Sequence, residues 1–276
     1  MTSVVIAAHN EEAVIGRCLD ALLDEDGGLD ITVVANGCGD RTAAVAAARP
    51  GVRVLDLPEP GKANALNAGD AVAVGFPRVY LDADIVLSPG ALTALAGALD
   101  TTSALAVVPR RVLDLTGRPL LVRAFYAVNS RLPAYRHALF GRGAIALSEV
   151  ARKRFETFPG YVADDLFLDS LFAVDEKREV STVSSTVEAP RRTRDLVRRL
   201  VRVRAGNAQL RAASSGVRRS VRSSWLRDVV LPRPWLYPAG ACYAALVLTA
   251  SYAARRQARG EVSWGRDEST RRLNHG

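Results

Sequence analysis

The chain has 276 residues, of which 49% are hydrophobic, which is ample for a folded core and excludes a generally disordered protein. Its three cysteines (Cys18, Cys38 and Cys242) lack the spacing of a metal site, so we expect no disulfide framework and a reducing compartment. The formal charge is +8, but residues 191–222 alone hold eleven arginines against one acid, so the rest of the chain is near neutral.

The first hundred residues alternate short β-branched runs with alanine-rich amphipathic stretches, which predicts an α/β fold with a parallel sheet covered on both faces. A strand pattern begins almost at once, so we expect no secretory signal. The predicted strands are Ser3–Ala8, Ile31–Ala35, Val52–Leu55, Arg78–Leu81 and Ala104–Val108. The predicted helices are Glu11–Leu23, Arg41–Ala48, Lys62–Val74 and Pro89–Leu99. The polar segments after the strands should meet along one edge of the sheet, where such sheets bind ligands.

The pattern becomes less regular after residue 110. Predicted helices cover Pro119–Tyr135, Ser148–Phe155, Asp165–Val174 and Arg194–Ala213, with a strand over Gly143–Leu147. A final segment, Trp235–Ala254, has no charged residue and is followed by two arginines.

The most informative feature is Asp82-Ala83-Asp84, which follows the apolar run Val79–Leu81. Two carboxylates at the end of a buried strand are costly unless a cation lies beside them. A hard divalent ion that carries a diphosphate would suit them, because Mg²⁺ and Mn²⁺ prefer oxygen ligands. Acidic pairs at strand ends also cap helices or face solvent.

A dinucleotide-binding Rossmann domain is the first rival for such an N-terminal half. It needs a glycine-rich turn after the first strand, next to the start of a helix. Here the turn has no glycine and contains Glu11 and Glu12, which would repel a pyrophosphate. NAD binding is therefore disfavoured.

Five stretches in a fixed order resemble the glycosyltransferases of family 2, and the likeness covers roughly residues 3 to 210. They are Val4–Glu12, Val33–Thr42, Gly61–Asn67, Leu81–Asp84 and Ala163–Leu166. The resemblance implies the GT-A fold, with a Rossmann-like, mostly parallel sheet. It implies a catalytic domain over 1–215, with a nucleotide-sugar half (about 1–110) and an acceptor half (about 111–215), followed by a basic and apolar extension over 216–276.

The resemblance assigns the nucleotide to the first two loops. Backbone groups near Ala8, with Glu12 close by, would hold the base, although Asn10 and the acids would also suit the start of a helix. In the second loop the family usually has Asp-Asp-Gly-Ser, which this chain replaces by Ala35-Asn36-Gly37-Cys38. Asn36 can still offer a donor and an acceptor to a base edge.

The resemblance also implies roles beside the diphosphate. Lys62 begins a predicted helix, where a cation is unfavourable unless it meets an anion such as a diphosphate; a solvated surface lysine is the alternative. Asp82 would contact the ribose or the metal, and Asp84 would be the main metal ligand. Asp165, with Asp164 beside it, would take the proton from the acceptor hydroxyl, while its alternative role is to cap the helix that it opens.

Arg198 and Arg202 resemble the basic motif that family members use beside the diphosphate, and their spacing places them on one helix face. A nucleic-acid-binding helix would explain the arginines but not the carboxylates, and residues 191–222 contain no stacking aromatic. Contact with anionic lipid headgroups is compatible with catalysis. For Trp235–Ala254 we expect association with a membrane surface, ahead of packing on the catalytic domain or a second subunit, and ahead of membrane spanning.

The sequence thus predicts a metal-dependent inverting glycosyltransferase, cytoplasmic or at the inner face of the membrane. The donor would be a nucleotide diphosphate sugar, UDP-linked, used with Mn²⁺ or Mg²⁺. The acceptor class stays open between a glycan, a lipid-linked compound and a small molecule, and a homodimer is compatible with the sequence. The alternative is a non-catalytic nucleotide-sugar-binding or membrane-scaffold protein of the same fold.

Overall fold

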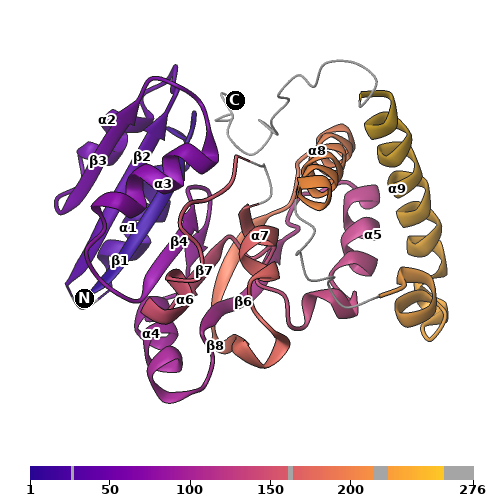
Figure 1. Ribbon diagram of the computed structural model, residues 1–276. Helices are drawn as coiled ribbons and strands as arrows, with labels where there is room; N and C mark the ends of the chain where they lie inside the picture. Colours follow the sequence, from indigo (N-terminus) through magenta and orange to yellow (C-terminus); the bar gives the residue numbers. More distant parts are fainter. Residues whose placement is uncertain (26–27, 161–163, 214–222, 258–276) are drawn as a thin grey trace. The chain divides into compact units, whose positions relative to one another are not determined.

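The computed structural model describes residues 1–25, 28–160, 164–213 and 223–257 (Figure 1). Their contacts divide the chain into two units. The first unit comprises Met1–Leu113 and Leu139–Val187, and the second comprises Asp114–Ala138 and the described residues from Glu188 onwards. The predicted division into a catalytic domain over 1–215 and an extension over 216–276 stays a prediction.

The first unit is an α/β structure whose strands and helices alternate along the N-terminal half. Its strands are β1 (Thr2–Ala8), β2 (Leu29–Asn36), β3 (Val52–Leu57), β4 (Arg78–Asp82), β5 (Val86–Leu87), β6 (Ala106–Asp114), β7 (Ala144–Leu147) and β8 (Lys177–Glu188). Its helices are α1 (Ile15–Leu23), α2 (Thr42–Ala47), α3 (Lys62–Val72), α4 (Ala91–Thr101), α6 (Glu149–Arg152), α7 (Asp164–Ser170) and the 3₁₀ turn η2 (Val174–Glu176).

Among the described residues, eight strands form one sheet in the order β3-β2-β1-β4-β7-β6-β8-β5. The pairs β3–β2, β2–β1 and β1–β4 are parallel, so the loops after these strands meet at one edge. The pairs β4–β7, β7–β6 and β8–β5 are antiparallel. The three parallel pairs are the longer ones, so the prediction of an α/β fold with a mostly parallel sheet is confirmed.

Side chains of β1 alternate between two apolar clusters, one on each face of the sheet. Val4 and Ile6 belong to a cluster with residues of α1, α2 and α4. Val5 belongs to the other cluster, with Leu66 of α3 and Phe172 next to α7. Because both faces are covered, the central strands are hydrophobic throughout, and the polar residues are left to the strand ends.

The second unit is helical in its described part. It contains α5 (Leu120–Asn129), η1 (Pro133–Tyr135), α8 (Thr193–Ala213), the π-helical turn η3 (Trp225–Val230), η4 (Pro234–Leu236) and α9 (Tyr237–Gln257). Helix α9 packs against α5 and α8. Its Tyr243 stacks on Phe125 of α5, with ring centroids 5.0 Å apart. In the described part of the chain, no helix is both long enough and apolar enough to cross a membrane.

The predicted elements in the N-terminal half agree with the structure to within a few residues, but three differences have physical causes. The predicted helix Pro119–Tyr135 ends at Asn129, because a residue before proline avoids the helical region and Leu132 is extended. The interpretation of Asn10 as a helix cap was wrong: Asn10 has φ 54°, and α1 begins only at Ile15. Strand β8 was missed, since its buried face carries the polar Ser185 among valines.

Candidate active site

Lys62 holds two carboxylates together at the carboxyl end of β4. Its side chain projects from the first turn of α3, and its Nζ lies 2.7 Å from Asp82 Oδ1 and 2.9 Å from Asp164 Oδ2. Asp82 ends β4, and Asp164 opens α7. The structure therefore joins three side chains that are far apart in the sequence, and all three are residues that the sequence analysis singled out.

Burial and neighbouring charges shift the pKa values of the groups in and beside this cluster. Burial disfavours the ammonium, but Asp164 and Asp82 outweigh that effect and raise the pKa of Lys62. Burial, opposed by Lys62 and reinforced by Asp165 and Asp82, raises the pKa of Asp164 to about 6. Burial likewise raises the pKa of Asp165, although Lys62 and the Gly141 amide work against it. Carboxyls with a raised pKa at a polar sheet edge are suited to proton transfer near neutral pH.

Asp165 is held by backbone amides. Its Oδ2 accepts a hydrogen bond from the N–H of Gly141 (3.0 Å), and its Oδ1 accepts one from Leu166 (2.8 Å). One helical turn later, Asp169 Oδ1 accepts from the N–H of Leu139 (2.8 Å). The two carboxylates on one face of α7 thereby fix the segment Leu139–Gly143, which we call the strap.

The strap continues from α7 to the end of β4. The N–H of Asp82 donates to the carbonyl of Gly143 (2.8 Å). Gly143 has φ 71°, and a Cβ added there would lie 2.3 Å from Ile85 Cγ1 and 3.5 Å from Asp82 Oδ2. Only glycine fits this backbone conformation and this close approach. The strap thus positions Asp82 and Asp165 relative to each other through the main chain.

Asp84 lies two residues beyond Asp82 and is half-buried. Burial, together with the charges of Asp84 and Asp82, raises the pKa of the Cys18 thiol. Among the described residues no group of three His, Cys, Asp or Glu side chains could hold a metal. The two aspartates nevertheless fit Mg²⁺ or Mn²⁺, because such ions are commonly held by one or two carboxylates, with phosphate and water oxygens completing the coordination.

The first two loops bind each other. The side-chain amide of Asn36 is 2% exposed; its Nδ2 donates to the carbonyl of Ala8 (2.7 Å), and its Oδ1 accepts from the N–H of Gly61 (3.0 Å). Glu12 Oε2 accepts from the backbone N–H of Arg41 (2.9 Å). Asn36 therefore ties the ends of β1 and β2 to the residue before Lys62. A contact of Ala8, Glu12 or Asn36 with a nucleotide base stays a prediction.

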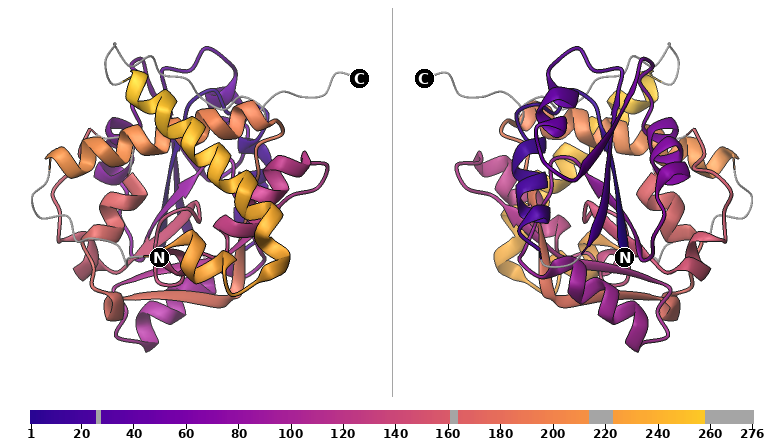
Figure 2. Two further views of the ribbon diagram at one scale, coloured as in Figure 1. Left: turned by 90° about the vertical axis from the view of Figure 1, so that its right-hand side faces the viewer. Right: turned by 90° about the vertical axis from the view of Figure 1, so that its left-hand side faces the viewer.

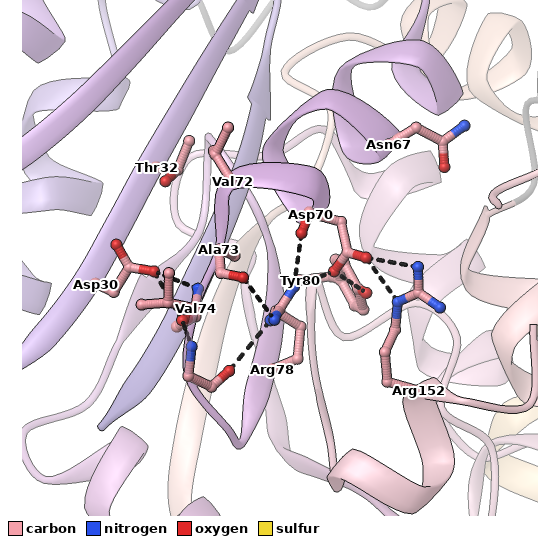
Figure 3. Close-up of polar contacts among 12 residues, drawn as sticks. Asp30, Thr32, Asn67, Asp70, Val72, Ala73, Val74, Arg78, Tyr80 and Arg152 are labelled. Carbon is pink, nitrogen blue, oxygen red and sulfur yellow. Dashed lines mark hydrogen bonds and ion pairs between the residues drawn. The ribbon is translucent and has the colours of Figure 1, made fainter. Parts of the chain in front are cut away.

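A buried polar network fixes α3, the helix that carries Lys62 (Figure 3). The carboxylate of Asp70 accepts from Tyr80 (2.8 Å) and Arg152 Nε (2.7 Å) and forms an ion pair with Arg78. Arg78 also donates to the carbonyl of Ala73 (3.0 Å) at the end of α3. The network thus joins α3 to β4 and α6, and removing one of its partners would leave a buried polar group unpaired.

Asn67 forms a second attachment from the same helix. Its Nδ2 donates to the carbonyl of Phe158 (3.1 Å), and its Oδ1 accepts from the N–H of Phe158 (2.7 Å). The ring of Phe158 is 3% exposed and contacts Tyr80 edge to face, with centroids 4.8 Å apart. Helix α3 thus anchors the segment that leads to Asp164 and Asp165. Sequence analysis placed Asn67 in a family motif but gave it no role.

Arg198 and Arg202 lie on α8, in the second unit. Arg198 Nη1 is 3.3 Å from Asp195 Oδ1, and its side chain is 58% exposed. The predicted placement of both arginines on one helix face follows from the observed helix, whereas their contact with a diphosphate stays a prediction.

Solved structures share this fold, and three of them are compared with the chain. They are a mannosyltransferase from Pyrobaculum calidifontis in complex with GDP-Man and Mn²⁺, a glucosyl-3-phosphoglycerate synthase from Mycobacterium tuberculosis with Mn²⁺, UDP and glucosyl-3-phosphoglycerate, and TarS from S. aureus with UDP-GlcNAc. The first is 20% identical with a TM-score of 0.61, covering 95% of this chain and 76% of the other. The second is 26% identical with a TM-score of 0.56, covering 77% and 79%. The third is 16% identical with a TM-score of 0.54, covering 68% and 58%.

A curated relative, an uncharacterized protein of Mycobacterium tuberculosis (strain CDC 1551 / Oshkosh), is 37% identical over 117 residues. The match covers 41% of this chain and 37% of the relative, so the chain spans little more than a third of that protein. The predicted GT-A fold is confirmed by the solved structures. The family model for glycosyl transferase family 2 matches residues 3–142, which is half of the chain, and the chain belongs to that family.

Proposed function

We propose that the protein is a metal-dependent inverting glycosyltransferase that moves a sugar from a nucleotide diphosphate sugar, UDP-linked, to a hydroxyl or phosphate of its acceptor. The observation that carries the proposal is the cluster at the end of β4, where Lys62 joins Asp82 to Asp164 beside Asp165. The complexes of the similar structures with GDP-Man, UDP-GlcNAc and Mn²⁺ support a nucleotide sugar and a divalent ion.

Asp84 and Asp82 would hold the ion, as Mn²⁺ or Mg²⁺. Four carboxylates (Asp82, Asp84, Asp164 and Asp165) stand against the single lysine of the cluster, so this edge of the sheet favours cations. The ion, when bound, would supply positive charge to the departing diphosphate. Ala8, Glu12 and Asn36 would face the nucleoside, and Lys62, Arg198 and Arg202 would contact the diphosphate.

Asp165 would remove the proton from the acceptor hydroxyl. Two backbone N–H groups orient its carboxylate, and burial raises its pKa toward a value useful to a general base. Asp164 would share this work by adding negative charge next to it, and its own pKa is about 6. Attack from the face opposite the leaving diphosphate would invert the configuration of the sugar.

The acceptor class stays open between a glycan, a lipid-linked compound and a small molecule, and we propose no nucleic-acid partner. As the sequence suggests, we place the enzyme in the cytoplasm or at the inner face of the cell membrane. A homodimer is compatible with this proposal.

Calorimetric titration of UDP-, GDP- and dTDP-sugars, with Mn²⁺ and then with EDTA, tests the donor site. We expect metal-dependent binding of one nucleotide class, lost in Asp84→Ala. Turnover of the donor that binds is then followed in Asp165→Asn, which should bind the donor normally but transfer no sugar, and NMR of the product gives the anomeric configuration. Binding without turnover in the wild-type protein would favour a non-catalytic nucleotide-sugar-binding protein, and no binding to any donor would refute the proposal.

A further inference from the structure

Helix α9 is apolar on both of its faces. The inner face, which packs against α5 and α8, contains Leu236 just before the helix, Tyr243, Leu246 and Ala250, all buried. The outer face shows Tyr237, Ala241, Ala245, Leu248 and Tyr252, which recur every three to four residues and are exposed. A helix on a protein surface ordinarily carries polar residues on its outer side, and one that is apolar all round is ordinarily buried.

The exposed side chains of this face are large. Leu248 is 68% exposed and Tyr252 is 63% exposed, and Trp235, just before the helix, is 73% exposed. Nine of the fifteen large hydrophobic side chains that are exposed in the described residues belong to the second unit, which has about a third of those residues. In Figure 2 (left), α9 is drawn in yellow and lies in front of the other helices of its unit. A concentration of exposed apolar groups of this kind indicates an interaction surface.

The positive charge of the second unit indicates that the partner surface is anionic. Its described residues include sixteen arginines against four acids. Arg255 and Arg256 continue the outer face of α9 at its C-terminal end, and Arg227 is exposed on the turn that precedes the helix. A second copy of the chain would bring this positive charge against itself, whereas an anionic surface would complement it.

We propose that the outer face of α9 lies flat on an anionic lipid surface. Leu248 and the two tyrosines would enter the boundary between headgroups and acyl chains, and Trp235 would anchor the N-terminal end of the helix. The arginines would stay among the lipid phosphates. Because the inner face of α9 is packed within its own unit, the helix lies along the surface and does not cross it. This proposal is independent of the donor site and of the transfer reaction.

Flotation of the full chain with vesicles tests it. We expect binding to vesicles of phosphatidylcholine with phosphatidylglycerol, much weaker binding to phosphatidylcholine alone, and release by salt. Trp235→Ser and Leu248→Ser should each lower the vesicle partition coefficient about tenfold, since each removes a large apolar side chain from the boundary. The control is Val74→Ser, because Val74 is 67% exposed but lies in the first unit, and it should bind like the wild type.

Circular dichroism verifies that each variant is folded, and Arg255→Gln with Arg256→Gln should weaken binding to the anionic vesicles alone. The proposal is overturned if the full chain does not float with anionic vesicles, or if the two serine variants bind like the control. It is also overturned if sedimentation shows a dimer that these variants dissociate, because a second copy would then occupy the face.

Discussion

Replacing Asn67 by alanine tests whether α3 positions Asp164 and Asp165, the proposed catalytic acids. The change removes two hydrogen bonds to the backbone of Phe158, of 2.7 and 3.1 Å, and leaves a buried N–H and a buried carbonyl without these partners. At about 1 kcal/mol for each bond, the free energy of unfolding should fall by about 2 kcal/mol. For a protein of this size the melting temperature should then fall by about 4–8 °C.

Urea unfolding measures the loss, and the matched control is Asn64→Ala, an exposed asparagine three residues earlier on the same helix. The control should unfold like the wild type. In the transfer assay, Asn67→Ala should lower kcat, because Phe158 leads to Asp164 and Asp165, and should leave donor affinity unchanged. Equal stability of the two alanine variants, or an equal effect on donor affinity and kcat, would refute this reasoning.

Three further predictions test the geometry of the strap, the cluster and the Asp70 network. Gly143→Ala should lower the free energy of unfolding by more than about 2 kcal/mol, since it adds a contact of 2.3 Å with Ile85 to the strain of a positive φ. The control Gly117→Ala is also at positive φ but has no atom within 4 Å, so urea unfolding should show a loss of only about 1 kcal/mol. The pKa of Asp164 is raised from 3.8 to about 6, so its contribution to stability is present in acid and is lost as the pH rises through about 6. The difference in unfolding free energy between the wild type and Asp164→Asn should therefore change between about pH 4 and about pH 7.5. A constant difference over this range would show that the shift is absent. Tyr80→Phe removes one hydrogen-bond donor from Asp70 but leaves both arginines in place, so a thermal melt should show a loss of about 1 kcal/mol in unfolding free energy. Arg152→Met should lose several times more, because it leaves a buried carboxylate with one ion-pair partner fewer. Equal losses would contradict the network.

The parallel half of the sheet could be predicted from the sequence because local patterns specify it. Val4, Ile6 and Val33 belong to short β-branched runs bounded by turn residues, and the structure places these runs in β1 and β2. The polar segments after the strands meet at one edge, as the rule for parallel strands requires. Such patterns need only a few neighbouring residues, and those are visible in one sequence.

Contacts between distant residues could not be predicted in this way. Asn36 was expected to offer its amide to a nucleotide, yet its amide joins Ala8 to Gly61, 28 and 25 positions away. The ion pair of Asp70 with Arg152 spans 82 positions, and no periodic pattern indicates it. Gly143 was predicted only as the first residue of a strand, because its close approach to Ile85 and Asp82 exists only in the folded chain.

Lys62 fits both the prediction made from the sequence and the contacts seen in the structure. A cation at the start of a helix opposes the helix dipole, which led us to expect an anionic ligand there. In the structure the anions are Asp82 and Asp164, and their attraction exceeds the cost of burying the ammonium. A donor diphosphate would compete with these carboxylates for the same ammonium. A divalent ion bound by Asp82 and Asp84 would weaken the attraction between Asp82 and Lys62. If both bind as proposed, donor and ion should therefore assist each other's binding.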